Sequence, residues 1–266
     1  MEIVVLGMHR AGTSLVTRLI NMMGAYFGPE GMALAPSVEN PKGFWERHDV
    51  LQCNDAILRL AGCHWDKLGA WQRPPLLPDE LTRRLHYIVL GMDAFRPWVM
   101  KDPRLCLTLP CWRKFLEVPV AVIVWRHPLE CARSLEMRNG MPKEWGLALW
   151  EYHAVGALNA SADMPRTFVG HHEAIADPVG TVQRLYDQLT RAEVAGLRLP
   201  SAREITAFVE PRLYRARVEN HGEAALSAWH STLFNMLRGV TPAPHALQVD
   251  AAAMHAMKRF SPPETL

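Results

Sequence analysis

Two glycines near the amino end stand at the spacing of a phosphate-binding loop, in the stretch GMHRAGTS at residues 7–14. Such loops follow the pattern G-x-x-x-x-G-K-[ST], in which backbone N–H groups hold phosphates and the lysine contacts the outer ones. Thr13 occupies the lysine position, and Arg10 is the only lysine or arginine within the loop. Gly7 and Gly12 allow the backbone to approach an anion closely. The predicted ligand-binding residues of this loop are Gly7, His9, Arg10, Ala11, Gly12, Thr13 and Ser14.

A second group that could bind an anion lies in WRHPLECARSL, residues 125–135. Arg126 ends an apolar run, and Ser134 follows eight residues later on a predicted helix. The planar guanidinium of an arginine can donate two hydrogen bonds to a phosphate. The alternative for Arg126 is a surface ion pair with Glu130.

Alternating strands and helices must position these groups. Short β-branched or apolar runs predict strands at 3–6, 98–100, 120–125 and 166–173. Helical spacing and capping signals predict helices over about 49–60, about 79–95, 109–116 with a proline at its start, and about 143–159. They also predict helices that begin near Thr13, at His127 and at Asp177. This order indicates an α/β fold of the P-loop type with three layers, a mostly parallel sheet between helices. Ligands bind beyond the carboxyl ends of such strands, where Gly7, Lys101 and Arg126 are expected.

Composition limits the class of protein. With 266 residues, 49% apolar and 21% charged, the chain suits one domain over 1–266 whose part after about 200 is largely helical. A net charge of +2 does not suggest a nucleic-acid binder. Five cysteines without a C-x-x-C pair indicate reduced thiols in a cytoplasmic protein rather than a zinc or disulfide framework. No apolar run is long enough to span a membrane, so we expect no stable membrane insertion.

The combination of GMHRAGTS with RHPLECARS resembles the sulfotransferases that use 3′-phosphoadenosine 5′-phosphosulfate (PAPS). Two further stretches, MKDPRLCLTLPCW and ENPKGFWE, resemble segments of the bacterial and tyrosylprotein-type members. The resemblance implies that Arg10, Gly12, Thr13 and Ser14 hold the 5′-phosphosulfate. It also implies that Arg126 and Ser134 hold the 3′-phosphate. Ala11 replaces the commoner serine, which leaves the backbone cradle unaffected.

The same resemblance implies a mechanism that needs no metal. Arg10 and Lys101 would stabilise the leaving 3′-phosphoadenosine 5′-phosphate (PAP), and Glu46 would act as general base. His48, Asp102 and Glu39 are the other candidates for the base, and an ion pair with Asp102 or Glu46 is the alternative for Lys101. Late arginines expected near the nucleotide, or else on a solvated face, are Arg212, Arg215 and Arg217.

Several points stay open at this stage. The acceptor is a small molecule, a glycan or a peptide tyrosine, and Trp65 or Trp71 could line its pocket. His171 and His172 are interpreted as structural, since the pair lacks metal-ligand spacing. The alternatives to a sulfotransferase are a small-molecule kinase that uses ATP and Mg²⁺, and a non-catalytic nucleotide-binding protein.

Overall fold

A four-stranded parallel sheet forms the centre of the protein. The computed structural model describes residues 1–37, 40–210, 226–244 and 246–261. The strand order is β2-β1-β3-β4, with bounds β1 (Glu2–Leu6), β2 (Trp98–Lys101), β3 (Pro119–Trp125) and β4 (Arg166–Gly170). Every residue of β1 and β3 is buried, as expected for inner strands of a sheet that helices cover on both faces. The register pairs Val5 with Lys101 on one side and with Val122 on the other.

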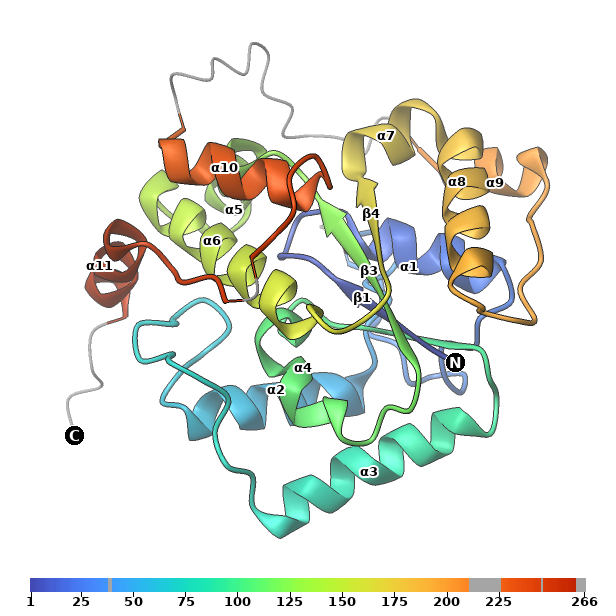
Figure 1. Cartoon of the computed structure of the whole chain (residues 1–266), viewed down its shortest axis with the longest axis horizontal. Helices are drawn as coiled ribbons and strands as arrows, with labels where there is room; N and C mark the ends of the chain where they lie inside the picture. Colours follow the sequence, from blue (N-terminus) through green and yellow to red (C-terminus); the bar gives the residue numbers. More distant parts are fainter. Residues whose placement is uncertain (38–39, 211–225, 245, 262–266) are drawn as a thin grey trace.

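Helices cover both faces of this sheet and form two apolar cores (Figure 1). Ile3 and Val5 of β1 face a core that includes residues of α1 (Thr13–Met22), α8 (Pro178–Arg191) and α9 (Ala202–Phe208). Val4 and Leu6 face the other core. The helices that contribute to that second core are α2 (His48–Leu60), α3 (Asp79–Asp93), α4 (Leu105–Arg113), α5 (Pro128–Asn139), α6 (Lys143–Ala160), α10 (Ala228–Leu237) and α11 (Ala251–Phe260). The short helix α7 (His171–Ala176) follows β4 directly.

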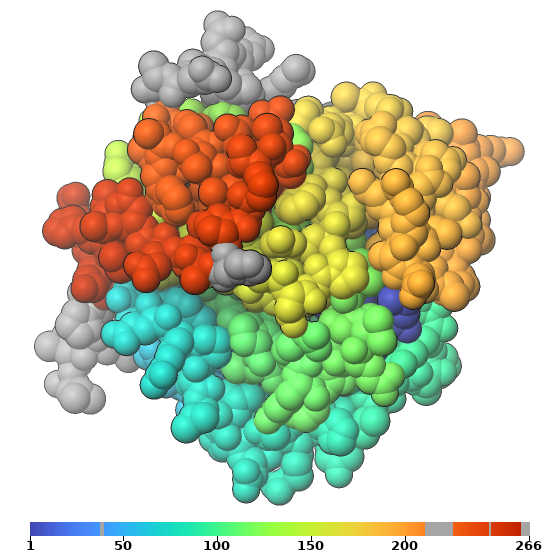
Figure 2. Space-filling model, in the orientation of Figure 1, coloured from blue at the N-terminus to red at the C-terminus, as the bar shows by residue number. Residues whose placement is uncertain are grey.

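The last two helices pack on α6. The indole of Trp145 stacks on Phe260 of α11 with ring centroids 5.0 Å apart, and Trp229 of α10 donates to Glu151 at 2.9 Å. Figure 2 shows these C-terminal segments, in orange and red, over one flank of the molecule. In the part of the chain that the structure describes, no helix has the length and apolar character to cross a membrane.

The predicted fold class is confirmed, and two element boundaries were wrong. α4 begins at Leu105, so Pro110 lies inside the helix and not at its start. Asp102 starts the turn earlier, because its carboxylate accepts the N–H of Arg104 at 2.8 Å. The predicted strand at 166–173 ends at Gly170, where the chain turns into α7.

Candidate active site

The loop between β1 and α1 has the close packing that its glycines predict. A Cβ on Gly7 would lie 2.5 Å from the carbonyl oxygen of Val124, and the N–H of Gly7 donates to the Cys106 sulfur at 3.2 Å. Gly12 has a φ of 91°, and a Cβ there would lie 2.3 Å from the His171 ring. Arg10 also has a positive φ, 70°, a conformation that a non-glycine residue rarely adopts. The first turn of α1 carries no acidic side chain, so this helix start can accept an anion.

The second predicted anion site lies directly against the loop. Arg126 donates to the backbone carbonyl oxygen of Arg10 at 3.0 Å, and Arg10 donates to the hydroxyl of Ser134 at 2.8 Å. Arg126 also forms an ion pair with Glu130 at 2.9 Å. That pair is buried, with side chains 7% and 1% exposed, rather than the surface pair that the sequence offered as an alternative. The two motifs therefore meet in one place, and Glu130 holds the guanidinium of Arg126 in position.

A third cluster forms where β2 ends beside the loop. The Lys101 ammonium, buried beneath the segment 40–46, makes an ion pair with Glu46 and donates to the Phe44 carbonyl oxygen at 2.9 Å. Ser14 donates to the same oxygen at 2.7 Å and lies 3.3 Å from the Lys101 nitrogen. Burial raises the pKa of Glu46, although the charge of Lys101 opposes that shift. A buried carboxylate with a raised pKa beside a fixed cation can accept a proton from a reacting hydroxyl.

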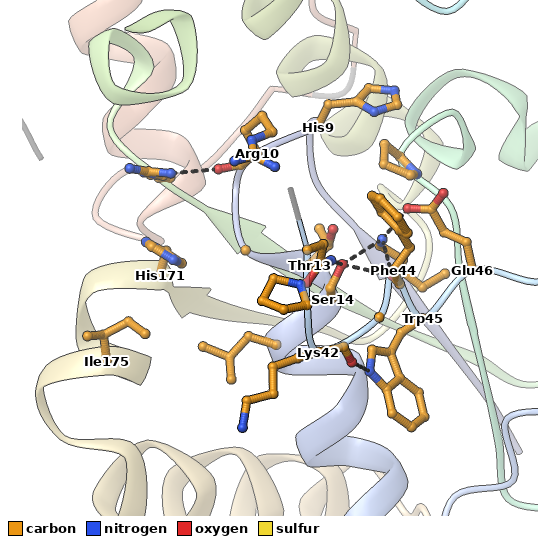
Figure 3. Close-up of a pocket in the computed structure, with 18 of the residues that line it drawn as sticks. His9, Arg10, Thr13, Ser14, Lys42, Phe44, Trp45, Glu46, His171 and Ile175 are labelled. Atoms are coloured by element: carbon orange, nitrogen blue, oxygen red, sulfur yellow. Dashed lines mark hydrogen bonds and ion pairs between the residues drawn. The ribbon is translucent and has the colours of Figure 1, made fainter. Parts of the chain in front are cut away.

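One pocket joins these clusters (Figure 3). Of the predicted site residues, those that line it are His9, Arg10, Gly12, Thr13, Ser14, Glu46, Lys101 and Arg126. In Figure 3, Glu46 lies at one end, His171 and Ile175 lie at the other, and Thr13 and Ser14 lie between them. An elongated ligand could therefore contact the loop and both ends at once.

Other predicted residues lie elsewhere. His48 is exposed at the start of α2 and does not belong to the pocket lining. Asp102 pairs with Arg104 at 3.2 Å instead of Lys101. Gly7 and Ala11 line a separate small cavity on the other side of the loop, and Ser134 contacts the loop through Arg10. Arg212, Arg215, Arg217 and Glu39 fall outside the described residues.

The pocket wall contains residues that the sequence did not single out for this site. Lys42 forms an ion pair with Glu210 at 2.6 Å, and its ammonium lies 5.2 Å from the centre of the Phe208 ring. This contact joins the 40–46 segment to the end of α9. His171, interpreted as structural from the sequence, also lines the pocket. Lys42 lies in the ENPKGFWE stretch, but its contact with Glu210 and the place of His171 in the pocket depend on segments that are distant in sequence.

His9 faces the aromatic side of the pocket. Its ring lies 4.7 Å from Trp65 and 5.7 Å from His153, centre to centre. Burial, with the charge of Arg104 nearby, lowers the pKa of His9 well below its usual range, so this imidazole is neutral. Its Nε2 atom is buried and has no hydrogen-bond partner among the described residues. Trp65, one of the two tryptophans that the sequence suggested for an acceptor pocket, thus contacts a residue of the pocket lining.

The fold and the site define an α/β protein with a glycine loop between β1 and α1, a lysine and a carboxylate where β2 ends, and an arginine where β3 ends. Residues 2–192 match the family described as the sulfotransferase family. The chain belongs to this family, which confirms the resemblance seen in its motifs, and family and fold together support a transferase.

One solved structure supports the architecture, and two others are similar at lower TM-scores. The sulfotransferase domain of the olefin synthase from Synechococcus PCC 7002 superposes with a TM-score of 0.50 at 14% identity, over 98% of this chain and 94% of that one. A sulfotransferase domain from the curacin biosynthetic pathway gives 0.45 at 11% identity, over 97% and 96%. Sulfotransferase STF9 from Mycobacterium avium gives 0.46 at 16%, over 91% and 77%. No curated protein sequence gives a significant match.

Proposed function

We propose that the chain transfers the sulfuryl group of PAPS to an acceptor hydroxyl and releases PAP. The observation that carries this proposal is the contact of Arg126 with the backbone of Arg10, which brings a guanidinium to the mouth of the glycine loop. A nucleotide with phosphates on both its 3′ and 5′ positions has the two separated anionic groups that such a pair of sites suits. Family membership over residues 2–192 supports the same donor.

In this proposal the backbone N–H groups at the start of α1, with the hydroxyls of Thr13 and Ser14, bind the 5′-phosphosulfate. Arg126 and Ser134 bind the 3′-phosphate. Arg10 donates to Ser134 in the structure, so its side chain must turn toward the sulfate to act in transfer.

Transfer needs positioning and charge stabilisation rather than a covalent intermediate. The acceptor oxygen attacks sulfur in line, the bond from sulfur to the bridging oxygen breaks, and the electron pair stays on PAP. In this proposal Lys101 neutralises the charge that grows on that oxygen. Glu46, its ion-pair partner, takes the acceptor proton.

The acceptor then enters at the Glu46 end of the pocket, where Pro103 and His9 form the wall and Trp65 packs behind His9. Such a wall offers a neutral hydrogen-bonding group on an aromatic support, which suits the hydroxyl of a sugar, a phenol or a related metabolite.

Calorimetry distinguishes this function from its alternative, a kinase. We expect PAP to bind without Mg²⁺, and Arg126→Lys, which keeps a cation beside Glu130, to weaken binding by about tenfold or more because the guanidinium fork is lost. Arg133→Ala, on the exposed side of α5, the helix that follows Arg126, is the matched control and should bind PAP as the wild type does. Binding of ADP that requires Mg²⁺, with no effect of Arg126→Lys, would favour the kinase.

A transfer assay tests catalysis itself. Incubation with ³⁵S-labelled PAPS and a panel of phenols, tyrosine peptides and glycans should move label to at least one acceptor class. A chain that binds PAP but moves no label would support a non-catalytic nucleotide-binding protein instead.

A further inference from the structure

His171 occupies a special place at the donor end of the pocket. It is the first residue of α7, and its ring packs so closely on Gly12 that an added Cβ would lie 2.3 Å from it. It lines the pocket together with Arg126 and Arg10. Figure 3 shows it at the end away from Glu46. A short connection from β4 fixes it there, because α7 begins directly after Gly170.

Charged groups from each neighbouring element surround this imidazole. The cations are Arg126 at the end of β3 and Arg10 in the loop, with the second histidine, His172, next on α7. The anions close by are Glu130, paired with Arg126, and Glu173, whose carboxylate accepts the N–H of Gly170 at 3.3 Å. Burial, with the charge of Arg126, lowers the pKa of His171 to about 3, so the ring is neutral. Arg126 is the cation that the proposed 3′-phosphate site uses, and Arg10 belongs to the loop proposed to bind the 5′-phosphosulfate.

His172 provides a natural comparison. Its side chain is 53% exposed, and its ring rests on Trp125 with centroids 4.9 Å apart. It does not belong to the lining of this pocket. Adjacent histidines of the same helix therefore have different surroundings, one in the pocket and one on the surface.

We propose that the imidazole of His171 binds the 3′-phosphate of the donor together with Arg126 and gains a proton from solvent as the phosphate binds. This inference rests on the proposed function. A dianionic phosphate neutralises the guanidinium charges that oppose protonation of the ring and adds a direct partner for an imidazolium N–H. The affinity for the donor then depends on pH through the His171 imidazole, which contacts the 3′-phosphate.

The sign of this dependence is set by the proton taken up. Uptake on binding makes PAP affinity rise as pH falls from about 8 to about 6, compared with a variant that cannot take the proton. The phosphate itself titrates near pH 6, and cations favour its dianion, which acts in the opposite direction. That second effect is common to all variants, so the ratio of dissociation constants, variant over wild type, isolates His171.

The test measures PAP binding by calorimetry at about pH 6 and pH 8 for wild type, His171→Phe, His171→Gln and His172→Gln. Phenylalanine keeps a ring against Gly12, and glutamine keeps a neutral hydrogen-bonding group if phenylalanine fails to fold. We expect His171→Phe to weaken PAP binding by about tenfold at pH 6 and by less at pH 8. His171→Gln should weaken it less at each pH, and its ratio to wild type should also be larger at pH 6. His172→Gln should match the wild type, and adenosine 5′-monophosphate, which lacks the 3′-phosphate, should bind all four proteins equally.

Each other outcome contradicts a stated part of the inference. Equal PAP affinities of wild type and both His171 variants overturn the contact with the phosphate. Ratios that are the same at both pH values overturn the proton gain. An equal loss of adenosine 5′-monophosphate binding indicates a general disturbance of the loop and also overturns the assignment. A wild-type chain that binds no PAP contradicts the proposed function, and this inference with it.

Discussion

Replacement of Gly12 by alanine tests the geometry of the loop most sharply. Two separate penalties are expected. The backbone has φ of 91°, and an L-residue in this left-handed region costs about 1–2 kcal/mol. The new methyl group would also lie 2.3 Å from the His171 ring, and overpacking of this kind costs about 1–3 kcal/mol. We therefore expect Gly12→Ala to lower the free energy of unfolding by about 2–5 kcal/mol.

A matched control separates the two penalties. Gly140, which ends α5, has φ of 65°, and among the described residues other than its chain neighbours no atom lies within 4 Å of a Cβ built there. Gly140→Ala should thus pay only the backbone penalty, about 1–2 kcal/mol. The assay is urea unfolding of both variants, with PAP affinity measured in parallel. Only Gly12→Ala should also lose PAP binding.

A double-mutant cycle tests the cause. In the background of His171→Ala the ring is absent, so Gly12→Ala should destabilise by less, with a coupling of about 1–2 kcal/mol. The reasoning is refuted if Gly12→Ala destabilises no more than Gly140→Ala, or if the cycle shows no coupling.

Three further predictions concern the rest of the site. Glu46→Gln should reduce transfer to any acceptor that the wild type sulfates by about 10²–10⁴-fold while PAP affinity changes little, and an unchanged transfer rate would remove Glu46 as base. The base must be ionised and burial raises the pKa of Glu46, so wild-type activity should fall as pH falls through a value above the pKa of an ordinary glutamate. Burial lowers the pKa of His153 to about 4, so as pH falls from 6.5 the unfolded chain takes up a proton at this residue before the folded chain does. The free energy of unfolding should therefore fall by up to about 1.4 kcal/mol per pH unit in this range. Urea unfolding of His153→Phe should lack this contribution to the pH dependence, whereas the same pH dependence in both proteins would contradict a buried neutral imidazole. Lys42→Met and Glu210→Gln should each speed PAP dissociation in stopped flow by a few-fold, since a partly exposed ion pair contributes about 0.2–1 kcal/mol. The double variant should dissociate no faster than either single variant, and additive effects would show that the pair does not act as one contact.

Much of the scaffold could be predicted from the sequence because the signals are local. The apolar runs at 3–6 and 120–125 fall within β1 and β3, and the glycine loop connects the first of them to α1. Parallel strands end at one edge, so the meeting of Gly7, Lys101 and Arg126 followed from their places after predicted strands. Pro110 misled the prediction of α4, since a proline often starts a helix but here lies within one. There it leaves the Cys106 carbonyl oxygen without its helical partner, and Gly156 of α6 packs against that oxygen.

The remaining features of the site depend on contacts between segments that are distant in the chain. The ion pair of Lys42 with Glu210 joins residues far apart in sequence, and the ENPKGFWE stretch that contains Lys42 does not indicate its partner. His171 was judged by its lack of metal-ligand spacing, but its place beside Gly12 depends on the end of β4 at Gly170. The partner of Lys101 was likewise open, because Asp102 is its neighbour in sequence and Glu46 its neighbour in space.

The central claim is that one nucleotide spans the glycine loop and Arg126, and a crystal structure of the chain with PAP tests it most directly. The account predicts the 5′-phosphate at the N–H groups that begin α1 and the 3′-phosphate within hydrogen-bonding distance of both Arg126 and Ser134. Density for the nucleotide with either phosphate facing solvent, or with no contact between Arg126 and the nucleotide, would contradict it.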